Sequence, residues 1–415
     1  MGGENLEEED YYHGLLPRED IPHLLVEEGD FLIRTSETAP NQTRQIIISI
    51  LVEKRTSIVK HVVVQQTHGK FLTDAQASFS SVPQLIRFYL KSGEPILSKL
   101  PSTVLRRAVS RAPWELRHES VTIQKKIGEG AFGEVFKGTY KLHAGRVVDV
   151  AIKLAKTAEM TKGKIKEMMK EARLMRNYEH PNVVRMYGVC VEHEPLLIVM
   201  ELVDGGALDV FLRRNQVPVK TKIEKIVAGS AWGLEYLHSR NCIHRDIAAR
   251  NCLLTRDEYQ MTKASRVPIK WLAPETIQRL VYTSKTDVWS YGVMIWEIFA
   301  NAEEPYKGMS NAQVKEKVAH GYKMEFASEA PAWIVQLVHD GCWQLDPIKR
   351  STMGHVAREI EKHAGLKPPV VNAIPGTTDP KSTQHSTDAK RRSISLKKSM
   401  STRKKGRKSR KKVAK

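Results

Sequence analysis

The sequence predicts an α+β fold with two folded domains and a basic C-terminal tail. The chain has 415 residues, and 41% of them are hydrophobic. A chain of this length and hydrophobic content exceeds a single typical core and allows two domains with tails. Strand-like runs and segments of helical periodicity are mixed in residues 11–105 and again in residues 120–365. No periodicity survives in residues 366–415, which we expect to be disordered.

The net charge of +19 is concentrated in the tail. Residues 381–415 hold fifteen lysines and arginines against one acid, Asp388, for +14, so the remainder carries 19 − 14 = +5. A basic arm is predicted rather than a basic globular surface. Its candidate partners are an anionic membrane surface and nucleic acid, and a merely solubilising tail is the competing interpretation.

Several features point to the cytoplasm. The four cysteines have neither zinc-site spacing nor the density of a disulfide scaffold, which indicates reduced thiols: they are Cys190, Cys242, Cys252 and Cys342. No apolar run approaches the length of a membrane span, and the acidic first ten residues do not resemble a signal peptide. We expect a cytoplasmic protein, for which the tail leaves a peripheral position at the membrane open.

The first domain is predicted to contain two helices and three strands. The strands are expected at residues 31–35, 45–52 and 58–65, and the helices at residues 18–28 and 82–89. The second helix is the clearer one, because apolar residues recur on one face. A charged residue, Arg34, lies inside the first strand and is costly to bury unless something pairs with it. An arginine on the solvent face is the plain alternative.

The surroundings of Arg34 decide between these alternatives. Residues 29–37, together with Tyr12-His13-Gly14 and Lys60-His61, resemble the Src-homology-2 (SH2) domain. The resemblance implies that phosphotyrosine proteins are partners and that Arg34 grips the phosphate with its planar guanidinium. It assigns supporting roles in this phosphotyrosine site to Arg18, Ser36 and His61.

The second domain, after a linker at residues 106–119, begins with a glycine-rich segment at residues 128–135. The three glycines alone are weak evidence for a function, because a plain turn or a dinucleotide fold would also contain them. Residues 134–138 continue with β-forming alternation, so the glycines are expected at the tip of a hairpin, as a lid over phosphates. Lys153 on the next strand could then reach the α- and β-phosphates.

A second motif lies at residues 244–251, His-Arg-Asp-Ile-Ala-Ala-Arg-Asn. Asp246 can orient an attacking hydroxyl and accept its proton, and Asn251 can offer an oxygen to magnesium. The octapeptide resembles the catalytic loop of protein kinases, and its Ala-Ala-Arg is the tyrosine kinase form. Residues 268–275 and 287–292 resemble later kinase segments.

Taken together, the chain resembles an SH2-containing non-receptor tyrosine kinase, most like the Fes and Fer group. This implies a two-lobed kinase fold that uses ATP and Mg²⁺, with Asn251 as metal ligand. It assigns catalysis to Lys153, Glu171, Asp246, Arg250 and Asn251. It assigns ATP binding to Ile127, Gly128, Gly130, Phe132, Gly133, Val135, Ala151, Lys153, Met200, Glu201, Val203 and Leu253. It further implies that Glu171 pairs with Lys153, that Asp287 accepts amides of the catalytic loop, and that Glu275 pairs with Arg350.

The chain departs from the kinase pattern after Asn251. Kinases carry an Asp-Phe-Gly about a dozen residues further on, whose Asp binds the metal, and this sequence has none. It passes almost at once into Tyr259, which resembles the phosphorylated tyrosine of an activation loop. We expect that a segment is missing which would carry the metal-binding Asp and a strand that covers apolar surface below ATP, and Asp257 is a poor substitute for the metal ligand. Two hypotheses remain: a tyrosine kinase, or an impaired pseudokinase that acts as a phosphotyrosine-binding scaffold.

Overall fold

The computed structural model describes residues 5–37, 42–74, 77–130, 133–142, 145–154, 161–254, 259–261 and 268–370. The chain divides into two units, Met1–Val371 and Asn372–Lys415. The predicted basic tail, from residue 371 onward, lies outside the described residues, as do Phe132 and Asp257. Within the described part, no helix is both long and apolar enough to cross a membrane.

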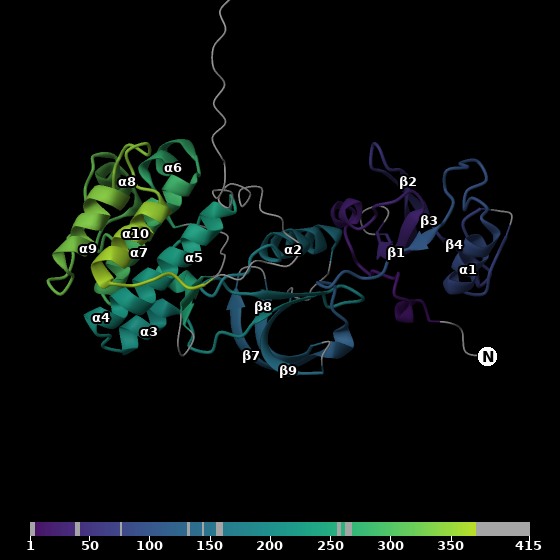
Figure 1. The fold of residues 1–415 in the computed structure, drawn as a ribbon, viewed down its shortest axis with the longest axis horizontal. Coiled ribbons are helices and arrows are strands. Elements are labelled where there is room, and N and C mark those ends of the chain that lie inside the picture. The colour runs from purple at the N-terminus through teal and green to yellow at the C-terminus, as the bar shows by residue number, and fades with distance from the viewer. Residues whose placement is uncertain are drawn as a thin grey trace, which may run out of the picture. The chain divides into compact units, whose positions relative to one another are not determined.

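The first domain is built on a four-stranded sheet in the order β3-β2-β1-β6 (Figure 1). The strands are β1 (Asp30–Ser36), β2 (Gln45–Glu53), β3 (Ile58–Val63) and β6 (Arg107–Ala108). The helix α1 (Val82–Ser92) buries its predicted apolar face, and a two-stranded sheet is formed by β4 (Gln65–Thr67) and β5 (Lys70–Leu72). The strands β1 and β2 each contain five consecutive buried residues, and α1 buries Val82, Leu85, Ile86 and Tyr89 at helical spacing.

Two expectations for this domain were wrong in extent. The predicted helix at residues 18–28 is a short 3₁₀ helix, η2 (Arg18–His23), which contains Pro22. Proline has no amide hydrogen to donate and its ring clashes with the preceding turn, so a longer α-helix is disfavoured here. The third strand ends at Val63, because Gln65 begins the separate strand β4.

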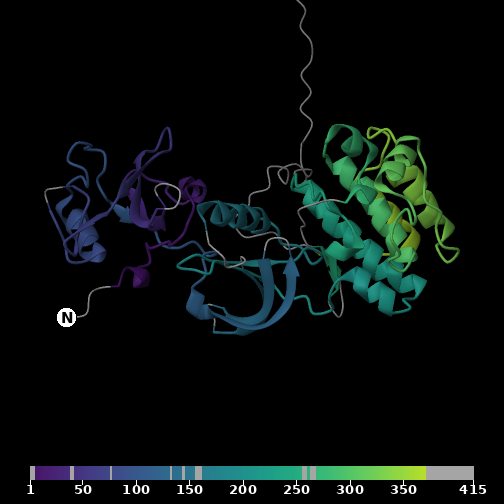
Figure 2. The ribbon, with the colours of Figure 1, turned by 180° about the vertical axis from the view of Figure 1, so that it is seen from behind.

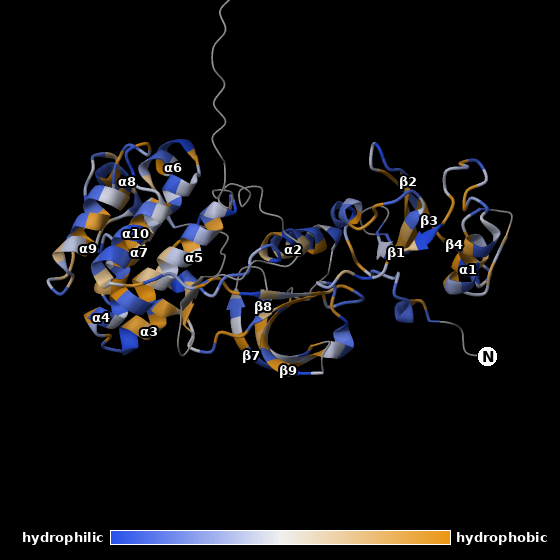
Figure 3. Cartoon of the chain, in the orientation of Figure 1, coloured by the Kyte–Doolittle hydropathy of each residue, from blue (hydrophilic) through white to orange (hydrophobic). Residues whose placement is uncertain are grey.

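The second domain begins with a five-stranded antiparallel sheet in the order β10-β11-β9-β8-β7. The strands are β7 (Val121–Gly130), β8 (Gly133–Lys141), β9 (Val147–Leu154), β10 (Met186–Cys190) and β11 (Leu197–Glu201). The helix α2 (Lys162–Met175) packs on this lobe (Figures 1 and 2). Figure 3 shows both hydrophilic and hydrophobic residues on α2, in keeping with its one buried face.

The remainder of this domain is mainly helical. Its α-helices are α3 (Leu208–Arg214), α4 (Val219–Thr221), α5 (Ala228–Ser239), α6 (Pro274–Arg279), α7 (Ser284–Phe299), α8 (Asn311–Ala319), α9 (Ala332–Gln336) and α10 (Met353–Ala364). Shorter turns are η5 (Ala249–Asn251) and η6 (Ile269–Trp271), and two π-helical segments are η4 (Lys222–Val227) and η7 (Leu337–Cys342). Nearly every residue of α7 is buried, so this helix forms the centre of the lobe.

A small sheet follows the catalytic-loop motif. The strand β12 (Cys252–Leu254) pairs antiparallel with β13 (Tyr259–Met261), in the register Leu254 opposite Tyr259. Cys252 and Leu254 are buried. The sequence suggested that a strand was missing at this point and that apolar surface would be left uncovered. That expectation was wrong for the strand, because residues 259–261 supply one.

The two domains share an interface within the first unit. Leu15, Leu16 and Ile21 of the first domain join one apolar cluster with Ile165 and Met168 of α2. Burying such side chains together stabilises the contact in proportion to the apolar area removed from water.

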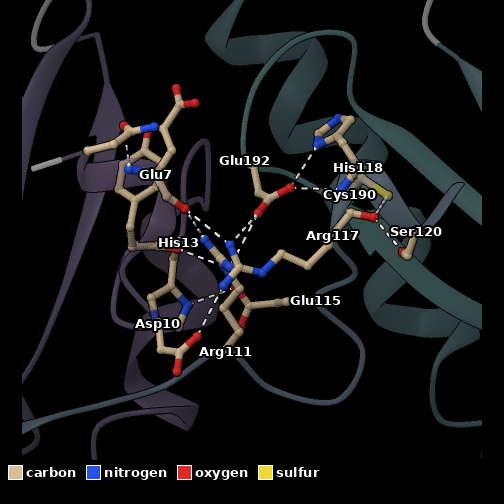
Figure 4. A network of polar contacts seen from close by, with 12 residues as sticks. Glu7, Asp10, His13, Arg111, Glu115, Arg117, His118, Ser120, Cys190 and Glu192 are labelled. Carbon is tan, nitrogen blue, oxygen red and sulfur yellow. Dashed lines mark hydrogen bonds and ion pairs between the residues drawn. The ribbon is translucent and has the colours of Figure 1, made fainter. Parts of the chain in front are cut away.

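The linker adds a polar network to this interface (Figure 4). Glu192 accepts hydrogen bonds from the His118 amide at 2.8 Å and from Arg117 Nη1 at 3.2 Å, while Arg117 Nη2 contacts Asp10 at 3.1 Å. Burial alone would raise the pKa of Glu192, but the hydrogen bonds from His118 and the nearby arginines lower it to about 2. The linker is therefore an ordered part of the contact between the domains.

Candidate active site and phosphate pocket

The glycine-rich segment forms the tip of an antiparallel hairpin. Gly128 lies opposite Val135, and Gly130 lies opposite Gly133, at the junction of β7 and β8. Gly133 has φ of 154°, a conformation that favours glycine. Because the segment leads into a strand and not into a helix, the dinucleotide fold is excluded, and the expectation of a hairpin is confirmed.

Lys153 projects from β9, next to the hairpin. In the sheet register it lies opposite Val135, and its Nζ donates to the two carboxylate oxygens of Glu171 at 2.9 and 2.7 Å. Glu171 comes from α2, whose first turn is capped by the Thr161 side chain. The expected pairing of Lys153 with Glu171 is confirmed. The pair brings a strand and a helix together beside the proposed phosphate lid.

A further group of the predicted ATP-binding residues lies at the end of β11 and just after it, with Met200 and Glu201 in the strand and Val203 beyond it. Met200 is opposite Ala151, and both Ala151 and Val203 are buried. The amide of Glu201 donates to the Arg185 carbonyl at 2.8 Å. This amide is therefore already hydrogen-bonded within the kinase domain. From the other lobe, Leu253 on β12 pairs with Ala207. Ile127 is half exposed. ATP contacts by these residues remain predictions.

The catalytic-loop motif holds its carboxylate firmly. Asp246 is buried, and its Oδ1 accepts a hydrogen bond from Arg250 Nη2 at 2.5 Å. Asn251 donates its side-chain Nδ2 to the Asp246 carbonyl at 2.8 Å, which fixes the orientation of the amide. The structure therefore brings Asp246, Arg250 and Asn251 into one cluster.

Asp287 anchors this loop from the buried helix α7. Its carboxylate accepts the amides of His244 at 2.7 Å and of Arg245 at 2.8 Å, and His238 Nε2 lies 2.9 Å away. Arg245 has a positive φ of 73°, a strained conformation that these bonds help to maintain. The expected role of Asp287 is confirmed.

The second expected buried pair is also present. Arg350 Nη1 and Nη2 donate to the carboxylate of Glu275 at 2.7 and 3.1 Å. Arg350 is buried, so loss of its partner would leave an uncompensated charge.

Two residues in contact with the catalytic loop, Trp271 and Glu297, were not among the predicted site residues. The Arg250 guanidinium lies 4.5 Å from the ring centroid of Trp271, and Trp271 Nε1 donates to Glu297 Oε2 at 2.9 Å. The same oxygen accepts the Ala249 amide at 3.0 Å. Burial raises the pKa of Glu297 to about 7, against the lowering effect of these hydrogen bonds. A glutamate within the apolar run of α7 was the available signal.

The first domain contains a separate pocket around Arg34. This side chain is buried on β1, and its Nε donates to Ser49 Oγ at 3.4 Å. Ser49 Oγ lies 2.9 Å from His61 Nδ1, a link that the sequence analysis missed. Among the described residues, Arg34 Nη2 has no hydrogen-bond partner. Arg18 and Ser36 line the same pocket as Arg34, and the fourth predicted residue, His61, is linked to Arg34 through Ser49.

This pocket is electrostatically prepared for an anion. Burial, reinforced by the charge of Arg18, lowers the pKa of Arg34 to about 10. Burial, followed by the charges of Arg34 and Arg18, lowers the pKa of His61 to about 4. The shift at Arg34 indicates a buried cation whose charge is not fully compensated, and a phosphate would compensate it, whereas the shift at His61 favours the neutral ring.

The described residues support a magnesium site less well than an ATP site. In the part of the chain that the structure describes, no three histidine, cysteine, aspartate or glutamate side chains gather as a metal site. Asn251 lies beside Asp246, and Asp257 lies outside the described residues. The described side chains do not by themselves complete a magnesium site. The proposed phosphorylation site, Tyr259, lies in β13, and its side chain is not described.

Comparison with known proteins identifies both domains. The family model described as protein tyrosine and serine/threonine kinase matches residues 121–360, and the SH2 domain model matches residues 11–89. The chain is 38% identical to Fer-related kinase 1 of Caenorhabditis elegans over 371 residues, which covers 85% of this chain and 93% of that protein. This chain belongs to the SH2-containing protein tyrosine kinases of the Fer and Fps type.

Other members of the Fer and Fps type show the same relationship. The chain is 35% identical to human tyrosine-protein kinase Fer, over 86% of this chain and 44% of that protein. It is 36% identical to the transforming protein Fps of avian sarcoma virus strain PRCII, over 84% of this chain and 67% of that protein. The chain thus spans less than half the length of human Fer. The SH2-then-kinase order is shown, while the proposed domain boundaries, residues 11–105 and 120–365, remain predictions.

Proposed function

We propose that this chain transfers the γ-phosphate of ATP to protein tyrosine and binds phosphotyrosine proteins through its SH2 domain. The observation that carries the catalytic part is the ion pair of Lys153 with Glu171, placed beside the glycine hairpin. In protein kinases this pair must form for the lysine to engage the nucleotide phosphates. Protein kinases in general use ATP with a divalent metal.

The residues act as follows in this proposal. Glu171 orients Lys153, whose ammonium group binds the α- and β-phosphates. Asp246 accepts the proton of the substrate tyrosine hydroxyl. The tyrosine oxygen forms its bond to the γ-phosphorus while the bond to ADP breaks, and ADP leaves. Arg250 holds the Asp246 carboxylate in place. The metal supplies neutralising charge at the phosphates when bound, and Asn251 would be one of its ligands.

The phosphotyrosine part rests on Arg34. A buried guanidinium with Nη2 unpartnered among the described residues fits a phosphate oxygen, because charge-assisted bonds there are strong. We place the protein in the cytoplasm, which its four free cysteines support, with a peripheral position at membranes through the tail. An anionic membrane surface or nucleic acid remains the proposed partner of the tail.

The absent Asp-Phe-Gly makes a direct assay necessary. Phosphotransfer to a tyrosine peptide should be measured by single turnover with the full chain and with Asp246→Asn. We expect transfer that the substitution reduces by at least about 100-fold. Equal rates in both proteins would reject Asp246 as the base. If neither protein transfers phosphate but phosphopeptide binding depends on Arg34, the chain is a phosphotyrosine-binding scaffold.

A further inference from the structure

The phosphotyrosine pocket has a second wall that comes from the kinase domain. One side is formed by Arg18, Arg34 and Ser36 of the SH2 domain, and the other by Lys162, Ile165 and Lys166. These last three residues lie in the first turns of α2, the helix that also carries Glu171. A pocket expected to belong to one domain is therefore shared by two.

Polar contacts hold this wall in place. Asp20 of the SH2 domain is buried and accepts hydrogen bonds from Arg173 of α2 at 2.9 and 3.0 Å. The Leu15 amide donates to the Val191 carbonyl of the kinase domain at 2.7 Å. Together with the apolar cluster between the domains, these bonds fix the distance between α2 and Arg34.

Both lysines have local contacts at the pocket. Lys162 Nζ donates to the Glu37 carbonyl at 2.9 Å, at the end of the SH2 strand β1. Lys166 Nζ lies 2.7 Å from Glu19 Oε1, and this hydrogen bond lowers the pKa of Glu19 although burial opposes it. Ammonium groups on flexible stems can turn from these acceptors toward a stronger anion.

The lining is strongly basic. Five of its side chains are cationic and one, Glu37, is acidic: the cations are Arg18, Arg34, Arg44, Lys162 and Lys166. Two of the five therefore belong to α2. Arg34 can grip a phosphate with its planar guanidinium, but a phosphate monoester carries close to two negative charges near neutral pH. Additional cations at the rim would balance the remainder.

We propose that Lys162 and Lys166 bind the phosphate of the phosphotyrosine ligand, so that the site is complete only when the kinase domain contributes α2. The inference rests on the proposed phosphotyrosine binding by Arg34 and adds the kinase-domain lysines to it.

Fluorescence polarisation with the full chain tests this inference. The probe is a labelled phosphotyrosine peptide whose other side chains are uncharged, so that only the phosphate attracts the lysines. The double variant Lys162→Ala/Lys166→Ala should bind about tenfold more weakly, since each partly exposed charge contributes up to about 1 kcal/mol. Its affinity should also fall less steeply with added salt, because two charge interactions are gone.

The matched control is Lys164→Ala/Lys170→Ala. It removes the same charge from the same helix, and neither residue lines the pocket. This control should keep the affinity of the unchanged protein, as should Lys162→Arg/Lys166→Arg, which retains the positive charge. If the two alanine pairs weaken binding equally, only overall charge matters and the inference is wrong. It is also wrong if the first pair has no effect.

Arg34→Ala separates the two levels of the proposal. Loss of binding in Arg34→Ala, with normal binding in Lys162→Ala/Lys166→Ala, would leave the phosphotyrosine function standing and overturn the shared pocket. Unchanged binding in Arg34→Ala would overturn the phosphotyrosine function itself.

Discussion

Asp20 and Arg173 form a two-bonded ion pair between the SH2 domain and the kinase domain. Both guanidinium donors reach the carboxylate, at 2.9 and 3.0 Å, and Arg176 adds a third contact at 3.5 Å. The carboxylate is fully buried. This ion pair holds the helix α2 of the kinase domain against the SH2 domain.

Asp20→Asn should destabilise the chain by about 3 kcal/mol, since removal of one partner leaves two arginines without their buried anion. Urea denaturation followed by tryptophan fluorescence measures this. Asp10→Asn is the control, because Asp10 pairs with Arg117 at an exposed position and should change stability by less than about 1 kcal/mol. Equal effects of the two substitutions would show that the buried pair adds nothing.

Arg250→Lys should lower kcat about tenfold. Lysine keeps the charge but loses the planar group that lies over Trp271 and bonds Asp246, a loss of about 1 to 2 kcal/mol. Steady-state phosphorylation of a tyrosine peptide provides the measurement. Arg213→Lys, at an exposed pair with Asp209, is the control and should leave kcat as it is. A normal kcat in Arg250→Lys would mean that charge alone positions Asp246.

Glu297 should make the kinase domain less stable as pH rises from about 4.5 to about 7. Its pKa is raised to about 7 in the fold, so in this window the folded state binds more protons than the unfolded state. Glu297→Gln keeps an acceptor for Trp271 and Ala249 but cannot ionise, and should remove this part of the pH dependence. Thermal unfolding across the window tests it, with exposed Glu316→Gln as control. Identical pH profiles for Glu297→Gln and the unchanged chain would contradict the prediction.

Glu192 should act in the opposite direction and at lower pH. Its pKa is lowered to about 2, so its contribution to stability is complete above the ordinary glutamate pKa near 4.5 and is lost as pH falls toward 2. Glu192→Gln should lose stability at pH 6 and show a shallower acid transition. Acid unfolding monitored by circular dichroism measures this effect. If the acid midpoint is the same with and without the substitution, the network of Figure 4 is not the source of the pH dependence.

Chelation of magnesium should change the affinity for ATP by less than about tenfold. The described residues offer Asn251 but no acidic cluster to bind the metal beside the phosphates. Calorimetric titration of ATP with magnesium or with a chelator measures this. A much larger effect of magnesium that disappears in Asp257→Asn would instead identify Asp257 as a metal ligand.

Contacts were predicted best from the sequence where the residues that contact each other lie within one short motif. The hairpin at Gly128 follows from glycines joined to β-forming residues, and the octapeptide brings Asp246, Arg250 and Asn251 together because they are close in sequence. Pairs distant in sequence, such as Glu275 with Arg350, were predictable only through the family resemblance.

Other features depend on tertiary packing that no local pattern shows. Glu297 meets Trp271 and Ala249 because α7 passes under both segments, and Ser49 meets Arg34 because two strands pair in one register. The wall of Lys162 and Lys166 requires two domains in contact. The strand β13 was missed because residues 259–261 resemble another part of the kinase pattern.

The small sheet of β12 and β13 bears on chemistry at Tyr259. Its backbone is held opposite Leu254 in a ladder of three residue pairs. A kinase that modifies this tyrosine must accept the chain as a separate extended peptide, so the ladder has to come apart first. A phosphate found on Tyr259 would therefore be a chemical record that the pairing of β12 with β13 had opened.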